Sequence, residues 1–116
     1  MAMKTHIRRD GNIVVVSLQG QLDYETTDLL RDNLFKLQKE ATNDQVVFDL
    51  GELQFVGSSG ISAFVQTLRD FNVSIQNRPR YANVRNEFKR IMTAFDDNQT
   101  FEFWDTTERA LRTIDN

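Results

Sequence analysis

Short apolar segments rich in strand-forming residues alternate along this chain with segments whose apolar residues recur at helical spacing, and this alternation constrains the fold most strongly. Strands that alternate with helices join through right-handed crossovers into a mostly parallel sheet. Val46, Val47 and Phe48 are apolar at successive positions and are followed by Leu50, a pattern typical of a central strand buried on both faces. The sequence therefore predicts an α/β fold built around a mostly parallel sheet.

The first part of the chain predicts a β-hairpin followed by a helix. Asp10-Gly11-Asn12 is a turn sequence between a first strand at about Thr5 to Arg9 and a second at about Ile13 to Gln19. The Thr26-Thr27-Asp28 cluster then predicts a helix start, and apolar residues recur after it at helical spacing, namely Leu30, Leu34 and Leu37. The hairpin thus adds an antiparallel strand to the sheet.

The middle of the chain predicts two more helices separated by a short strand. The second helix has an apolar stripe of Ile61, Phe64, Val65, Leu68 and Phe71. Val73-Ser74-Ile75 predicts a brief strand after it, and Pro79 suits the first turn of a third helix. The apolar stripe of that helix consists of Val84, Phe88, Ile91, Met92 and Phe95.

The last part of the chain predicts a strand and a helix. The strand contains Phe101, Phe103 and Trp104, and Trp104 points to the opposite face, where it covers either a second core layer or an exposed contact patch. Thr106-Thr107-Glu108 predicts the start of a terminal helix with Leu111 and Ile114 on one face. The predicted order is β-β-α-β-α-β-α-β-α, with about four helices, in a single domain of residues 1–116.

Composition excludes several kinds of chemistry. The chain has no Cys and a single His, His6, so it lacks thiolate ligands, disulfides and a site built from several histidines. Its formal charge of -3 gives no overall positive field for nucleic acid. The longest apolar run, Ile13 to Val16, is too short to span a membrane, and no signal peptide is visible. We expect a cytoplasmic protein with no metal and no cofactor.

Catalytic motifs are absent as well. The sequence contains no phosphate-binding loop, no dinucleotide fingerprint, no His-Glu-x-x-His and no nucleophile elbow. A Ser-His-Asp arrangement would have to recruit His6 from a strand near the amino terminus. We therefore predict no catalytic residues, although a small enzyme that uses Ser58 as its nucleophile stays open as an alternative.

Residues 49–61 lead from the central strand to the second helix, where open α/β folds usually place their sites. Gly57-Ser58-Ser59-Gly60 forms the turn between the two elements. A Ser hydroxyl at a helix start can cap the helix. It can also accept a phosphoryl group, whose charge the free backbone N–H groups and the helix dipole would stabilise.

This stretch resembles the STAS family, which includes the anti-sigma factor antagonists of bacteria and domains appended to sulfate transporters. Asp49, Leu53, Phe55, Ser58, Ser59, Gly60 and Ile61 match the family pattern in register, and Gly20-Gln21-Leu22-Asp23 is similar to a second family motif. The element order predicted above is also that of the family.

The resemblance implies a function. Ser58 would be phosphorylated by a partner serine kinase, Ser59 would support the turn, and Asp23 would lie near the same surface. The unphosphorylated protein would bind an anti-sigma factor/serine kinase and free a sigma factor, and phosphorylation would abolish that binding. The residues expected to bind the partner are Asp23, Gly57, Ser58, Ser59, Gly60 and Ile61.

Gly57 stands where the family pattern most often has Asp. The loss of this carboxylate beside the acceptor hydroxyl motivates an alternative, a STAS-like scaffold subunit of a transport or signalling assembly that is not phosphorylated.

The segment from Arg78 to Arg90 is strongly basic. It carries a net charge of +4, which leaves -7 for the rest of the chain. Arg85 and Lys89 are four residues apart and share a helix face that could meet an acidic partner, although a solvated helix face is the more common reason for such a pattern.

Overall fold

The computed structural model describes residues 3–22, 24–41, 43–54, 61–96 and 100–112. The strands are β1 (Lys4–Asp10), β2 (Ile13–Gln21), β3 (Gln45–Gln54), β4 (Arg80–Ala82) and β5 (Glu102–Trp104), and the helices are α1 (Tyr24–Glu40), α2 (Ile61–Ser74), α3 (Asn86–Ala94) and α4 (Thr107–Arg112). The predicted order of elements and the α/β fold class are confirmed.

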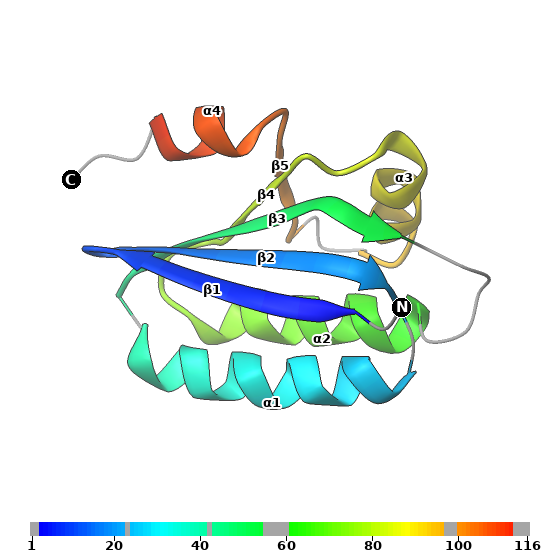
Figure 1. Ribbon diagram of the computed structural model, residues 1–116, viewed down its shortest axis with the longest axis horizontal. Helices are drawn as coiled ribbons and strands as arrows, with labels where there is room; N and C mark the ends of the chain where they lie inside the picture. Colours follow the sequence, from blue (N-terminus) through cyan, green and yellow to red (C-terminus); the bar gives the residue numbers. More distant parts are fainter. Residues whose placement is uncertain (1–2, 23, 42, 55–60, 97–99, 113–116) are drawn as a thin grey trace.

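The five strands form one sheet in the order β1-β2-β3-β4-β5 (Figure 1). Strand β1 pairs with β2 in antiparallel fashion, and each of the other neighbouring pairs is parallel. The hairpin turn places Gly11 at a φ of 62°, a conformation that glycine adopts without a steric penalty. The predicted hairpin and parallel sheet are therefore both present.

Helices α1 and α2 lie against one face of the sheet and α4 lies on the other (Figure 1). The main core fills the α1–α2 side, and strand β3 contributes Val46 and Phe48 to it, both fully buried. Val47 points the other way into a smaller cluster with Val15, Ala82 and Ala110. Strand β3 is thus buried on both faces, as its apolar run predicts.

Trp104 belongs to this second layer. Its ring packs against the smaller cluster, whereas Phe101 and Phe103 belong to the main core. The alternation of side chains along β5 therefore resolves the choice left open by the sequence in favour of a second core layer.

The prediction of a strand at Val73-Ser74-Ile75 is wrong. Helix α2 continues to Ser74, and Val73 is 74% exposed on its outer face. Ile75 is buried four positions after the buried Phe71, which is helical spacing. Packing of the helix face thus outweighed the strand preference of two β-branched residues.

The prediction that Pro79 begins the third helix is also wrong. Pro79 directly precedes β4, and α3 begins only at Asn86. The ring of Tyr81 in β4 stacks on Phe48 with 4.8 Å between ring centroids, so this short segment is held in the sheet by its core contact. Within the predicted stripe of α3, Phe88 and Met92 are buried, Val84 and Ile91 are partly buried, and Phe95 is exposed.

Threonine clusters predicted the starts of two helices, with different accuracy. Helix α1 begins at Tyr24, so Thr26 and Thr27 lie within its first turn and are buried. In α4 the prediction is close, because the Thr106 hydroxyl accepts a hydrogen bond of 3.1 Å from the Arg109 N–H and caps the helix. Ile114 lies outside the described residues.

Candidate functional site at the carboxyl ends of β2 and β3

The two sequence motifs meet at one edge of the sheet. Gly20 pairs with Leu53 and Gln21 with Gln54 in the parallel β2–β3 ladder. The Leu22 N–H then donates a 3.1 Å hydrogen bond to the Gln54 carbonyl oxygen. Strands β2 and β3 therefore end together, and the chain leaves both strands at the same place.

Buried leucines anchor these two strand ends. Leu22 is 5% exposed and Leu53 is 1% exposed, and both belong to the main core. A hollow of about 300 Å³ beside the strand ends is lined by Gln19, Gly20, Gln21, Glu52 and Gln54. The described part of the site thus combines strand ends anchored in the main core with a hollow lined mainly by polar side chains.

Most of the predicted site residues follow directly after these strand ends. Asp23, Phe55, Gly57, Ser58, Ser59 and Gly60 lie outside the described residues. Ile61 is described and is the first residue of α2. Its side chain is 7% exposed and packs in the main core, so it fixes the start of α2 and leaves little surface for a partner.

Asp49 supports a bulge in β3. The β2–β3 register shifts between Ser17 and Gln19, where β3 holds one extra residue. The Asp49 carboxylate accepts hydrogen bonds from the Gly51 N–H at 3.0 Å and from the Asn83 side-chain amide at 3.1 Å. The Asp of the matched motif therefore shapes the strand that leads to residue 55.

Asn83 is a site-supporting residue that the sequence reasoning missed. It follows β4 with a φ of 59°, in the left-handed region, where Asn is more common than most residues. Its amide also donates to the Thr107 hydroxyl at 3.0 Å, which ties the end of β4 to α4. An Asn directly after a predicted strand would have been the available signal, but β4 itself was not predicted.

Close packing at Gly51 completes this support. A Cβ added there would lie 3.1 Å from the Cβ of Asn83 and 3.3 Å from an Asp49 carboxylate oxygen. Any larger side chain would have to displace Asn83 or Asp49. The bulge, the carboxylate and the amide therefore form one fitted unit beside the strand end.

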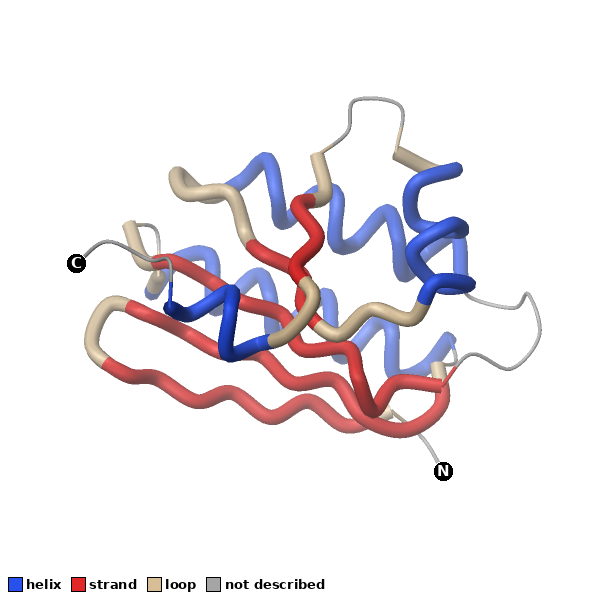
Figure 2. Tube along the Cα trace, turned by 90° about the horizontal axis from the view of Figure 1, so that it is seen from above, coloured by secondary structure: helices blue, strands red, loops and turns tan. Residues whose placement is uncertain are grey.

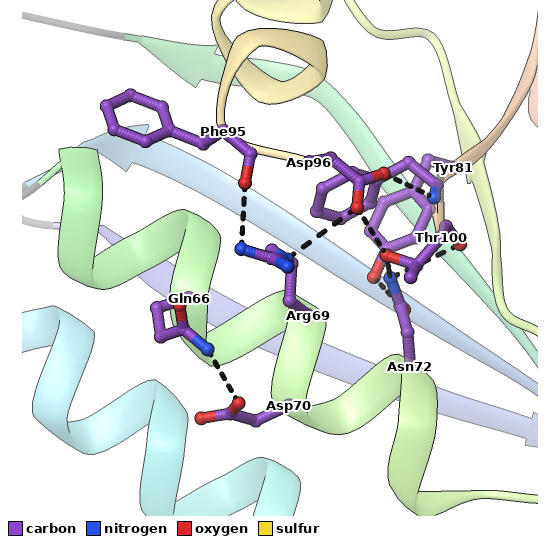
Figure 3. A network of polar contacts seen from close by, with 9 residues as sticks. Gln66, Arg69, Asp70, Asn72, Tyr81, Phe95, Asp96 and Thr100 are labelled. Atoms are coloured by element: carbon purple, nitrogen blue, oxygen red, sulfur yellow. Dashed lines mark hydrogen bonds and ion pairs between the residues drawn. The ribbon is translucent and has the colours of Figure 1, made fainter. Parts of the chain in front are cut away.

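A buried polar network connects α2 with the end of α3 (Figure 3). From α2, Arg69 donates to the Phe95 carbonyl oxygen at 2.9 Å and lies 3.6 Å from the Asp96 carboxylate. Asp96 also accepts from the Phe101 N–H and the Thr100 hydroxyl, each at 3.0 Å. Since the Asp96 side chain is 3% exposed, these donors compensate a buried charge.

Tyr81 joins the same network from the sheet. Its hydroxyl donates a 2.6 Å hydrogen bond to the side-chain oxygen of Asn72, and the Asn72 amide reaches Thr100 (Figure 3). Burial raises the pKa of Tyr81 well above its ordinary value, and the nearby charge of Asp96 raises it further, against the opposing effect of the Asn72 hydrogen bond. Tyr81 is therefore a neutral donor that holds α2 on the sheet.

The basic segment forms part of the surface of α3. Arg85 and Arg90 are exposed, and Lys89 lies 5.3 Å from the centre of the Phe103 ring. A shallow hollow on this helix is lined by Asn86, Lys89, Arg90, Thr93 and Ala94. The network through Arg69 fixes this basic surface relative to α2.

Two further features are absent from the described part of the chain. No three Asp, Glu or His side chains there gather closely enough to share a metal ion. None of the four described helices has the length and apolar character needed to cross a membrane.

Comparison with known families decides the classification. A model of the STAS domain matches residues 4–110, nearly the full length of the chain. The chain belongs to the STAS domain family. The resemblance carried by the two sequence motifs is thereby confirmed at the level of the family.

One named relative of this STAS domain is an anti-sigma factor antagonist. An anti-sigma F factor antagonist of Paenibacillus polymyxa is 26% identical over 65 residues, which is 56% of this chain and 56% of that relative. The match therefore spans little more than half of either protein.

Solved structures share the STAS fold. The crystal structure of an anti-sigma factor antagonist from Mycobacterium paratuberculosis superposes with a TM-score of 0.80 at 18% identity, covering 97% of this chain and 93% of that chain. The phosphorylated form of the Bacillus cell fate determinant SpoIIAA gives a TM-score of 0.66 at 16% identity, covering 94% and 97%. At these identities the likeness concerns the fold.

Proposed function

We propose that this STAS domain is an anti-sigma factor antagonist that binds an anti-sigma factor/serine kinase and so releases a sigma factor. Phosphorylation of Ser58 is the off switch. The observation that carries the proposal is the pairing of Gly20 with Leu53 and of Gln21 with Gln54, which brings the two family motifs to one edge of the sheet. The names of the relatives support the same function.

The position of Ser58 suits a phosphorylation switch. Ser58 stands three residues before α2, and the first turn of α2 contains no acidic residue. Free N–H groups and the positive end of a helix dipole stabilise added negative charge. A phosphoryl group adds about two negative charges there, which changes what can dock on that surface.

The proposed partner surface combines the site with α2 and α3. Asp23, Gly57, Ser58, Ser59 and Gly60 would contact the kinase directly, and Ile61 would hold the start of α2 in place. The basic face of α3 would add contacts to acidic residues of the partner.

The chain has no catalysis of its own in this proposal. The partner supplies ATP and transfers the phosphoryl group, and the Ser58 hydroxyl accepts it. Residues 1–116 act as a single domain in the cytoplasm, where sigma factors work.

Co-purification from the native cells tests the proposal. We expect the wild type and the Ser58→Ala variant to retain the same kinase, and the Ser58→Asp variant to lose it because its charge imitates phosphorylation. Asn12→Asp, in the exposed hairpin turn at the opposite end of β2, is the matched control for an added charge away from the site and should retain the kinase. If Ser58→Asp retains every partner as well as the wild type does, the switch is refuted.

Gly57 favours a second candidate, a scaffold subunit that is not phosphorylated. It lacks the carboxylate that the family pattern most often places beside the acceptor. Intact-mass measurement of protein from its native cells separates the two candidates, because a substantial fraction carrying one phosphoryl group at Ser58 contradicts the scaffold and supports the switch.

A further inference from the structure

Strand β1 forms an open edge of the sheet. Among the described residues it pairs with β2 alone, through a continuous register from Lys4↔Gln19 to Asp10↔Ile13. All of its residues are exposed except Thr5, which is half-buried. Figure 2 shows β1 at the margin of the sheet, beyond the helices. Such an edge offers a row of N–H and C=O groups to another strand.

The hairpin turn determines which backbone groups point outward. Gly11 has a φ of 62° at the first central position of a two-residue loop, as in a type II′ turn. Residues that flank such a turn form a hydrogen-bonded pair, and these pairs alternate along the ladder. The backbone groups of Asp10 are thus directed at β2, and those of Thr5, Ile7 and Arg9 at the open edge.

We propose that two copies of this chain associate through β1, antiparallel, about a two-fold axis at Ile7. The outward backbone groups of Ile7 then pair with those of the second Ile7, and the groups of Thr5 pair with those of Arg9 in the second copy. Lys4 faces Asp10 of the second copy at both ends of the interface, and His6 faces Arg8. The two sheets become one continuous sheet.

Charge selects this register over its neighbours. A two-fold axis at His6 would place Lys4 opposite Arg8, and an axis at Arg8 would place two arginines opposite each other, both repulsive arrangements. With the axis at Ile7, each Lys4 meets an Asp10 at a non-hydrogen-bonded position just outside the outer Thr5–Arg9 pair, where side chains approach closely.

The remaining charges on β1 do not oppose this arrangement strongly. Arg9 is already paired with Asp44 at 2.6 Å within its own chain. Charged side chains commonly protect an edge strand against foreign strands. Here their order complements a second copy of β1, so the same charges favour self-pairing over other pairings.

Two exposed apolar side chains lie on the same side of this edge. Ile7 is 49% exposed, and its partner Val16 points into the main core, on the α1 side of the sheet. Leu29 in α1 is 61% exposed. Viewed along the axis of α1, Leu29 and Arg31 lie about 100° to either side of the buried Leu30. Arg31 lines a groove between α1 and α2. Leu29 therefore faces away from α2.

Sedimentation equilibrium over a wide range of protein concentration tests the proposal. We expect a concentration-dependent dimer of the wild type. Lys4→Asp places two carboxylates opposite each other at both ends and should weaken dimerisation about tenfold or more. Combining Lys4→Asp with Asp10→Lys exchanges the charges and should restore dimerisation toward the wild-type value.

Control variants distinguish a loss of the β1 interface from a loss of folding and from a change in net charge. Arg90→Asp changes net charge equally on α3 and should leave dimerisation unchanged. Unfolding curves of each variant show whether its monomer is folded, and Ile7→Lys, at a half-exposed position, should abolish the dimer while retaining the fold. A wild type that stays monomeric at every concentration, or a double variant no better than Lys4→Asp alone, overturns the proposal.

Discussion

Asp49 illustrates how a residue of the matched motif acts without standing at the proposed phosphorylation position. Its carboxylate holds the Gly51 N–H and the Asn83 amide at the bulge in β3. The bulge sets the course of the last residues of β3 before the chain reaches residue 55. We therefore assign Asp49 to supporting the site rather than to binding a partner.

Replacing Asp49 tests this assignment. Asp49→Ala leaves two donors without their acceptor, and we expect a loss of about 2 kcal/mol in the free energy of unfolding. Asp49→Asn keeps one acceptor oxygen and should lose less than about 1 kcal/mol. Urea denaturation measures both. Equal losses in the two variants would mean that the hydrogen bonds of the carboxylate are not what stabilises the bulge.

Tyr81 predicts a pH dependence of stability. Its pKa is raised in the folded state by burial, so at high pH the unfolded chain releases this proton while the folded chain keeps it. The stabilisation is complete below the ordinary tyrosine pKa of about 10 and is lost as pH rises above it.

The Tyr81→Phe variant isolates that effect. At neutral pH it should be less stable than the wild type by about 1 to 3 kcal/mol, because the Asn72 oxygen loses its donor. The difference should shrink as pH rises above about 10, since only the wild type loses stability through Tyr81. Unfolding free energies that stay parallel across this pH range would contradict the prediction.

At the scale of elements, the strength of the sequence pattern decided what could be predicted. Helix α2 was predicted correctly at its start because five apolar residues follow helical spacing and all five are buried. Strand β4 was missed because it has three residues, two of which are not typical of a strand, and its place depends on Tyr81 stacking on Phe48. Local sequence carries little of that information.

The same limit applied to the site. The family resemblance implied that Asp23 and Ser58 lie near one surface, but no motif indicated Asn83. It lies 34 positions from Asp49, and their contact depends on the parallel β3–β4 pairing. The Arg69–Asp96 contact between α2 and the end of α3 was likewise beyond reach, because it is made by residues far apart in sequence.

Arg69 predicts how firmly α3 is held against α2. Arg69→Met removes the cation beside the buried Asp96 and the donor to the Phe95 carbonyl oxygen, and we expect a loss of about 2 kcal/mol. Arg31→Met is the matched control, since Arg31 and Asp28 form an exposed pair whose loss should cost about 0.5 kcal/mol or less. Thermal unfolding compares them, and equal losses would refute the role of the network.

At the scale of the whole molecule, the proposed contacts use different elements of the fold. The carboxyl ends of β2 and β3 with the start of α2 carry the proposed switch, α3 presents basic residues, and β1 offers an edge to a second copy. Lys4 in β1 pairs with Gln19 at the site hollow, so a dimer through β1 would bring the second copy near the proposed switch.

The central claim is that phosphorylation of Ser58 controls partner binding, and a binding titration tests it most directly. The chain is phosphorylated by its anti-sigma factor/serine kinase, the modified residue is located by peptide mass, and both forms are titrated against the kinase by calorimetry. We predict that phosphorylation weakens binding by about a hundredfold or more, because the added charge lies within the contact surface. Equal affinity of the two forms, with Ser58 fully phosphorylated, would contradict the account.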